Sequence, residues 1–231
     1  MTMNYILEHF LLVVLLIAVV FTVVWISLYR KRLHIGIIAV VIISALHVLY
    51  GVFCVKAFAF LESGAETGSF SKMSIFGAVF FMPVAYFFGA KLTKRKQSDV
   101  FDIFTICTVF TLACSRVNCL VSGCCSGIPF FGMNYCWPTR EIEIVYYFLF
   151  IILLAPRIFK GKTNGEVYPL YMLSYGALRF LLEFVRVSSS LSLLHLTHLW
   201  AAIALILGLA IYLEQLARQK RSNETKIKRR Q

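Results

Sequence analysis

Residues 8–29 read EHFLLVVLLIAVVFTVVWISLY, and the basic residues Arg30, Lys31 and Arg32 follow directly. An apolar stretch of roughly 20 residues is long enough to cross a bilayer as a helix. Six more apolar stretches follow along the chain, at 34–58, 73–92, 101–121, 141–159, 166–186 and 193–215. The pattern predicts an all-α, polytopic integral membrane protein with seven transmembrane helices.

The composition agrees with a membrane protein that has no separate soluble domain. Of the 231 residues, 60% are hydrophobic, and the mean hydropathy is +0.80. The longest gap between apolar stretches, about 122–140, is too short to hold a soluble domain. We therefore expect a seven-helix membrane domain over 1–217 and a basic tail over 218–231. No basic segment precedes the first stretch, which favours a retained helix over a secretory signal peptide.

Positive charge is concentrated in every second gap between the apolar stretches. Of the 23 Lys and Arg residues, 17 lie in four clusters: Arg30, Lys31 and Arg32; Lys91, Lys94, Arg95 and Lys96; Arg157, Lys160 and Lys162; and seven residues after Ala217. Cytoplasmic loops of membrane proteins are enriched in Lys and Arg. The clusters predict an N-terminus outside and a cytoplasmic C-terminus. They also explain the net charge of +12 without nucleic-acid binding, which we do not expect.

The few charges inside apolar stretches are the candidates for chemistry. Arg116 lies within the stretch 101–121, and a buried Arg in a membrane usually faces the bundle interior and has a partner. A second set, spaced so that its members share one helix face, consists of Tyr175, Arg179, Glu183 and Arg186. Glu183 can pair with both arginines of this set. The set is either an internal salt bridge that only neutralises the helix or part of a site shared with Arg116.

The start of the fifth stretch carries two further acids, Glu141 and Glu143. Acidic residues near a helix N-terminus stabilise the helix dipole, so a purely structural role is open. Glu143 is also the first of them to enter the apolar layer, so a functional role is equally open.

The gap before this stretch contains Ser122, Gly123 and Gly127, which permit tight turns and close approach to a ligand. Together with Arg140 and the other arginines, this loop would suit a phosphate, because guanidinium groups bind phosphate oxygens in pairs. In a membrane, the abundant phosphate is a phospholipid headgroup. The sequence therefore predicts an anionic lipid as the ligand.

Four of the seven cysteines, Cys119, Cys124, Cys125 and Cys136, lie in or beside the same gap. The run Cys119-x4-Cys124-Cys125 matches no familiar zinc-ligand spacing, so we expect neither a metal nor another cofactor. A disulfide framework and small buried thiols both stay open. His195 and His198 share a helix face and could reach the site, although an interfacial position alone would explain them.

Three segments together resemble the prolipoprotein diacylglyceryl transferase family: Arg116 to Gly127, Pro138 to Glu143, and Tyr175 to Arg186. The likeness runs from about Gly68 to Leu213. It implies a multi-pass protein of the bacterial plasma (inner) membrane with an outward active site. By matching positions it implies lipid-phosphate contacts for Arg116, Arg179 and Arg186, an orienting role for Glu183, and a loop shaped by Gly123 and Gly127.

The chain departs from the family pattern at two places. Where the family has a His in the loop before the third span, this chain has Phe76, so the usual candidate for deprotonating an acceptor thiol is missing. Cys119 and Ser122 stand where the family has two Asn residues. Glu143, Tyr175 or the His195–His198 pair are the remaining candidates for the general base.

The resemblance implies transfer of the diacylglyceryl group of phosphatidylglycerol to a thiol. The acceptor would be the lipobox Cys of a prolipoprotein or the thiol of another peptide. A non-catalytic relative that binds lipid or peptide, or a small transporter, is the alternative, because transporters also carry charges within the membrane.

Overall fold

The computed structural model describes residues 3–64, 73–129, 136–186 and 196–228. These residues form seven α-helices, and the described ranges contain two isolated β-bridges but no strand. The helices are α1 (Met3–Leu33), α2 (Ile37–Glu62), α3 (Phe76–Leu92), α4 (Gln97–Val121), α5 (Thr139–Phe159), α6 (Val167–Glu183) and α7 (Leu196–Lys228). The all-α prediction is confirmed for this part of the chain.

Five of these helices, α1, α2, α4, α5 and α7, are long and apolar enough to cross a membrane. The other two, α3 and α6, have 17 residues each, which gives a length of about 25 Å. Large apolar side chains on the outer faces of the bundle are exposed, as a bilayer would require, among them Leu16, Ile38 and Leu153. The chain is a multi-pass membrane protein, and the number of its spans stays a prediction.

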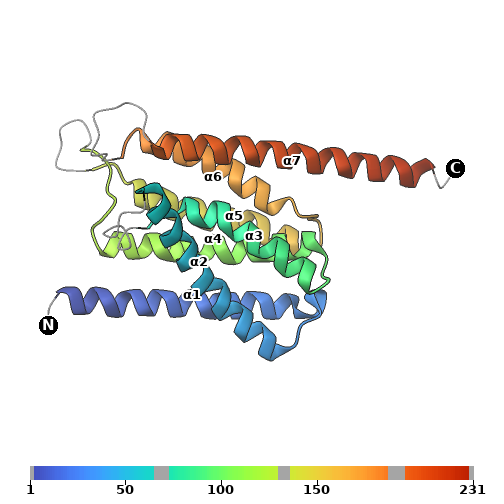
Figure 1. Cartoon of the computed structure of the whole chain (residues 1–231), viewed down its shortest axis with the longest axis horizontal. Helices are drawn as coiled ribbons and strands as arrows, with labels where there is room; N and C mark the ends of the chain where they lie inside the picture. Colours follow the sequence, from blue (N-terminus) through green and yellow to red (C-terminus); the bar gives the residue numbers. More distant parts are fainter. Residues whose placement is uncertain (1–2, 65–72, 130–135, 187–195, 229–231) are drawn as a thin grey trace.

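The helices run back and forth along the molecule so that alternate turns share an end (Figure 1). The turns between α1 and α2, α3 and α4, and α5 and α6 lie at the end opposite the N-terminus. The end of α7 lies beyond that same end, because α7 continues as one helix through residues 218–228 of the basic segment. The basic clusters therefore gather at one end of the bundle, as their spacing along the sequence predicted.

The centre of the bundle is α4, which packs against α1, α3, α5 and α6. In its most apolar window 67% of the residues are buried, against 22–28% in the other four long helices. Its Asp102 carboxylate accepts hydrogen bonds from the amides of Gly165 (2.8 Å) and Val167 (3.1 Å). This fixes the start of α6 against α4 and thereby sets the position of the charged face of α6.

Two glycines allow α6 and α7 to pack with their backbones in close contact. A Cβ atom at Gly176 would lie 2.7 Å from the amide nitrogen of Leu205, and Gly208 meets the backbone of α6 in the same way. Small residues of this kind let membrane helices approach closely. The charged side chains of α6 lie on the neighbouring face of the helix, where Arg179 meets Glu143 of α5.

Candidate active site

Four charged side chains from three helices meet near the end of the bundle where α4 ends and α5 begins. Glu143 of α5 lies between Arg116 of α4 and Arg179 of α6. One carboxylate oxygen of Glu143 pairs with Nε of Arg116, and the other is 3.0 Å from Nη1 of Arg179. Nη2 of Arg179 lies 2.8 Å from the carboxylate of Glu183. We call these four residues the Arg–Glu cluster.

The members of the Arg–Glu cluster are almost fully buried. The exposed fractions are 6% for Arg116, 1% for Glu143, 5% for Arg179 and 7% for Glu183. Buried charges of this kind are strongly destabilising unless they are paired, which explains why each cluster member has an ionic partner. Arg116 has an ionic partner, but this partner is Glu143 of α5 and not a residue of α6, and the carboxylate of Glu143 joins α4, α5 and α6.

The charged face of α6 was correctly predicted from the spacing of its residues. Glu183 pairs with Arg179 and also lies 3.9 Å from Nη1 of Arg186, which follows the end of the helix. Arg186 is the most exposed of these side chains, at 22%. Three guanidinium groups therefore share two carboxylates and leave one positive charge in excess, which suits a singly charged phosphodiester.

The structure distinguishes between the two acids at the start of α5. The side chain of Glu141 is 41% exposed and lies 3.7 Å from Arg140, as expected for a surface residue near a helix start. Glu143 instead bridges two buried arginines that come from other helices. A stabilising effect on the dipole of α5 is therefore not the main role of Glu143.

A cavity of about 960 Å³ adjoins the Arg–Glu cluster. Arg116, Arg179, Glu183 and Arg186 all contribute to its lining, together with apolar side chains from α1, α2 and α3. A cavity of this volume is in the range that holds a small-molecule ligand. The lining also includes Lys56 and Glu62 of α2, and this combination of charged and apolar groups suits an amphiphile with a phosphate head.

Aromatic side chains support the buried side of the cluster. Tyr175 is fully buried and stacks between Tyr147 and Tyr171, with ring centroids 5.7 and 5.6 Å apart. Phe76, at the position of the missing His, lines the cavity with its ring 6.3 Å from that of Tyr175. Tyr175 was expected from its place on the charged face of α6, whereas Tyr147 and Tyr171 were not, although each lies four residues from a predicted position on its own helix.

Several predicted residues shape the loop after α4 instead of touching the Arg–Glu cluster. The hydroxyl of Ser122 donates to the carbonyl of Asn118 at the end of α4, and Gly123 turns the chain with a φ of 67°. The amide of Gly127 donates to the carbonyl of Trp137, where a side chain on residue 127 would collide with Trp137. Arg140 donates to the carbonyl of Cys124 at 3.1 Å.

Of the two histidines predicted near the site, the structure describes only His198. His198 is 2% exposed and packs against Phe184 and Phe180, with ring centroids 4.6 and 5.3 Å apart. It is not among the described residues that line the cavity. His195 lies outside the described residues, so the predicted role of the pair stays a prediction.

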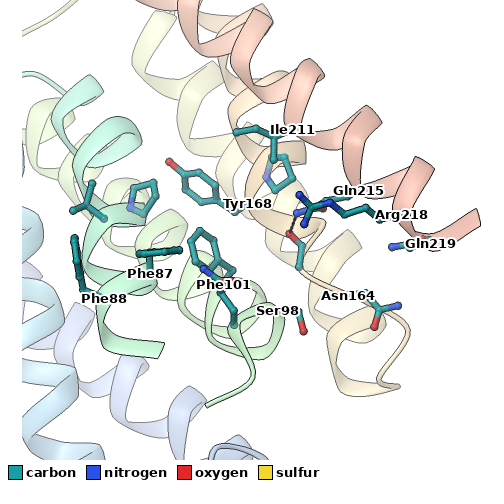
Figure 2. Close-up of a pocket in the computed structure, with 15 residues that line it drawn as sticks. Phe87, Phe88, Ser98, Phe101, Asn164, Tyr168, Ile211, Gln215, Arg218 and Gln219 are labelled. Atoms are coloured by element: carbon teal, nitrogen blue, oxygen red, sulfur yellow. Dashed lines mark hydrogen bonds between the residues drawn. The ribbon is translucent and has the colours of Figure 1, made fainter. Parts of the chain in front are cut away.

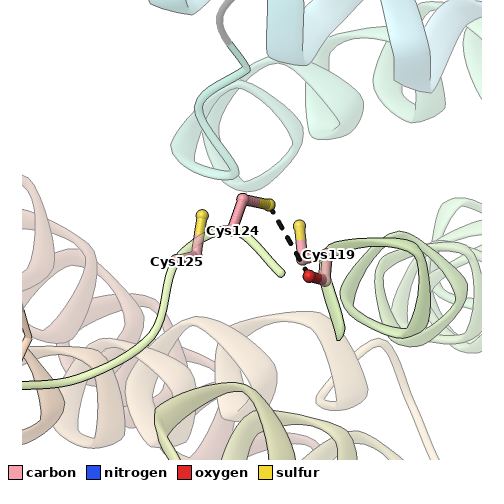
Figure 3. A group of neighbouring side chains, drawn as sticks. All are labelled: Cys119, Cys124 and Cys125. Carbon is pink, nitrogen blue, oxygen red and sulfur yellow. Dashed lines mark hydrogen bonds between the residues drawn. The ribbon is translucent and has the colours of Figure 1, made fainter. Parts of the chain in front are cut away.

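The structure also brings together three thiols whose grouping the sequence spacing did not predict. Sulfur atoms of Cys119, Cys124 and Cys125 lie within 4.8 Å of one another, at the end of α4 and in the following loop (Figure 3). The hydrogen bond from Cys119 lowers the pKa of Cys125 to about 5, against the effect of partial burial, and the positive charge of Arg116 acts in the same direction.

The sequence of this chain is similar to those of bacterial prolipoprotein diacylglyceryl transferases. A sequence model described as prolipoprotein diacylglyceryl transferase matches residues 32–214. A phosphatidylglycerol–prolipoprotein diacylglyceryl transferase of Clostridium tetani is 25% identical over 138 residues, covering 52% of this chain and 55% of the relative. One from Dehalococcoides mccartyi is 24% identical over 173 residues, covering 66% and 65%. The chain thus spans a little over half to about two thirds of the length of these relatives.

Proposed function

The chain belongs to the prolipoprotein diacylglyceryl transferase family, and on that premise we propose that it transfers the diacylglyceryl group of phosphatidylglycerol to a cysteine thiol. The acceptor would be a prolipoprotein, as in the names of the relatives, or another peptide with an accessible thiol. The observation that carries the proposal is the buried Arg–Glu cluster together with Arg186, which leaves one positive charge in excess beside a cavity of about 960 Å³.

The proposed reaction is a substitution at the glycerol carbon that carries the phosphate. The acceptor sulfur forms a bond to this carbon while the carbon–oxygen bond to phosphate breaks, and the electron pair goes to the phosphate oxygen. Glycerol phosphate leaves with the added negative charge. Arg116 and Arg179 would stabilise that charge, because fixed cationic groups in a site shielded from water act most strongly where charge develops. Arg186, which is more exposed, would bind the entering headgroup.

The contacts of Glu143 and Glu183 favour a positioning role for both carboxylates. Both oxygens of Glu143 are engaged by arginines, so neither oxygen is directed at the cavity in the way that a general base requires. Glu183 holds Arg179 from the other side. We propose that the two carboxylates hold the guanidinium groups in the orientation that the lipid phosphate requires.

We also propose that all seven helices cross the membrane, with the N-terminus outside. The Arg–Glu cluster comes from the C-terminal parts of α4 and α6 and the start of α5, and these helix ends lie opposite the basic turns (Figure 1). A cytoplasmic location of those turns would therefore direct the cluster to the outer face of a bacterial inner membrane. Thiol-reactive labels that cannot cross membranes provide the test in intact cells. Labelling of an Asn164→Cys variant from outside, in the α5–α6 turn, would contradict this orientation.

The transferase proposal is tested with the purified protein in nanodiscs that contain phosphatidylglycerol. A lipobox peptide is added, and a diacylglyceryl adduct on its Cys is measured by mass spectrometry. Arg116→Ala and Arg179→Ala should each reduce the rate by at least about a hundredfold, the size of effect found when one electrostatic donor is removed from an active site. Arg218→Ala is the matched control, because Arg218 is exposed and pairs with Glu214 on α7.

A second candidate function is a relative that binds lipid or peptide without catalysis. Phe76 is the observation that favours it, because the position of the family His carries no ionisable group. Phosphatidylglycerol binding that depends on Arg116 and Arg179, together with no adduct on any thiol peptide, would support this second candidate. An adduct formed at full rate by both arginine variants would exclude the proposed site.

A further inference from the structure

The three thiols beside the Arg–Glu cluster are held together by an unusual turn of the backbone. Cys119 is in the last turn of α4, and Gly123 and Cys125 then adopt left-handed conformations with φ values of 67° and 61°. A positive φ is uncommon for a residue with a side chain and is typically kept where function or packing requires it. Here the turn directs the Cys124 side chain back toward Cys119 and brings the sulfur of Cys125 close to both (Figure 3).

The spacing of the sulfur atoms is close to that of a metal site. Tetrahedral zinc has zinc–sulfur bonds of about 2.3 Å, which places its sulfur ligands about 3.8 Å apart. The three sulfurs lie within 4.8 Å of one another, so a shift of about 1 Å would bring them to this distance. Cys124 is exposed and the other two are half-buried, which leaves a path for an ion.

The surrounding charge also suits a metal bound by three thiolates. Three thiolates around a divalent cation carry one net negative charge. Arg116, Arg179 and Arg186 line the same cavity as all three cysteines, and the one positive charge that Glu143 and Glu183 leave in excess offsets this charge. The three protein ligands leave a fourth position, as in zinc sites where a substrate or water completes the coordination.

We propose that Cys119, Cys124 and Cys125 bind a thiophilic divalent cation of the zinc class, and that its open position takes the acceptor thiol. The second half of this proposal rests on the proposed transferase function. The acceptor thiol would lose its proton to water on binding, since a metal-coordinated thiol is deprotonated. Its sulfur then bonds to the glycerol carbon, the carbon–oxygen bond breaks, and the phosphate takes the electron pair. The resulting thioether carries no charge and is released as a weaker ligand.

The proposal gives a chemical role to a feature that the Arg–Glu cluster leaves unexplained. The cluster can hold a phosphate and stabilise its departure, but both oxygens of Glu143 are engaged and Phe76 is apolar. A metal ion would activate the acceptor thiol without a side-chain base. The thiols and the arginines line one cavity, so the nucleophile and the leaving phosphate would meet there.

The binding test uses Co²⁺ as the probe on the full chain, purified in detergent under reducing, metal-free conditions. We expect one equivalent of Co²⁺ to give thiolate-to-cobalt charge-transfer absorption that Zn²⁺ removes by competition. Cys119→Ser, Cys124→Ser and Cys125→Ser should lose this absorption. Cys136→Ser is the matched control, because Cys136 is an exposed thiol near the same loop but outside the group.

Three results would overturn the metal site. One is absorption that persists in all three serine variants, and another is an absence of cobalt absorption in the reduced wild-type protein. A disulfide among the three cysteines in protein isolated directly from membranes, with no zinc detected by elemental analysis, would likewise overturn it. Thermal unfolding of each variant shows whether a lost signal reflects a lost fold.

The role in transfer is tested separately, with the adduct assay before and after removal of zinc by a chelator. Loss of transfer on chelation and recovery with Zn²⁺ would support the acceptor role, whereas equal transfer in both states would overturn it. If the zinc-loaded wild type forms no adduct although the cobalt signal is present, then the transferase function and the acceptor role both fail while the metal site stands. The failures of the two proposals can therefore be told apart.

Discussion

Replacement of Glu143 by Gln tests the central physical argument, because this one carboxylate separates two buried guanidinium groups. Glutamine keeps the shape of the side chain but removes the negative charge between Arg116 and Arg179. Breaking a buried ion pair by removing one partner costs about 3–5 kcal/mol. For a chain of this length 1 kcal/mol corresponds to about 2–4 °C, so the melting temperature should fall by roughly 6–20 °C.

The lipid dependence of this effect is the more specific part of the prediction. Without Glu143 the site has two excess positive charges, so an anionic headgroup should bind more tightly than in the wild type. A ligand at a hundred times its dissociation constant stabilises the folded state by about 2.7 kcal/mol. Phosphatidylglycerol should therefore restore much of the lost stability, while phosphatidylcholine, which has no net charge, should not.

The measurement is thermal unfolding by intrinsic fluorescence in nanodiscs of either lipid. Glu141→Gln is the matched control, since Glu141 lies two residues earlier on α5 and its side chain is 41% exposed. The reasoning would be refuted if Glu143→Gln and Glu141→Gln unfold at the same temperature. It would be refuted equally if phosphatidylglycerol and phosphatidylcholine restore the stability of Glu143→Gln to the same extent.

Three further changes test other parts of the structure. Phe76→His should raise the rate of adduct formation by roughly a hundredfold, the lower range for a positioned acid–base group, while Phe80→His, one turn further on α3, should not. Gly176→Leu should abolish close packing of α6 on α7 and lower the yield of folded protein in size-exclusion chromatography, whereas Gly89→Ala, which has open space around it, should leave the yield unchanged. Asp102→Ala should lower the free energy of unfolding by about 1–3 kcal/mol, because two backbone amides lose their acceptor; chemical denaturation in detergent would reveal this.

The parts of the fold and site that the sequence predicted are those marked by a pattern within one segment, such as an apolar stretch or a regular spacing of charges. The apolar stretches predicted most helix ends to within about five residues, although α7 continues to Lys228, well past the predicted end at 215. The basic gaps identified the end of the bundle at which alternate turns gather. Regular spacing on one helix was enough to predict that Glu183 pairs with Arg179 and Arg186. Arg116 was identifiable because an isolated charge in an apolar stretch requires a partner.

The remaining features depended on contacts between helices or on local turns. Glu143 could not be separated from an ordinary acid at a helix start, because its role depends on arginines from two other helices. The grouping of the three cysteines depends on left-handed turns at Gly123 and Cys125, which the sequence spacing does not specify. Arg140 has a backbone carbonyl as its partner, and such a contact leaves no pattern in the sequence.

The ratio of charges in the site follows from two opposing requirements. With fewer carboxylates, buried guanidinium groups would repel one another and the bundle would lose several kcal/mol of stability. With a third carboxylate the site would be neutral, and a phosphate would gain nothing over its hydration shell on entering. Two glutamates among three arginines meet both requirements. Glu143 and Glu183 keep Arg179 paired from both sides. The more exposed Arg186 has only a 3.9 Å contact to Glu183. The charge left in excess is therefore placed at the more exposed side of the site, where a lipid headgroup would enter.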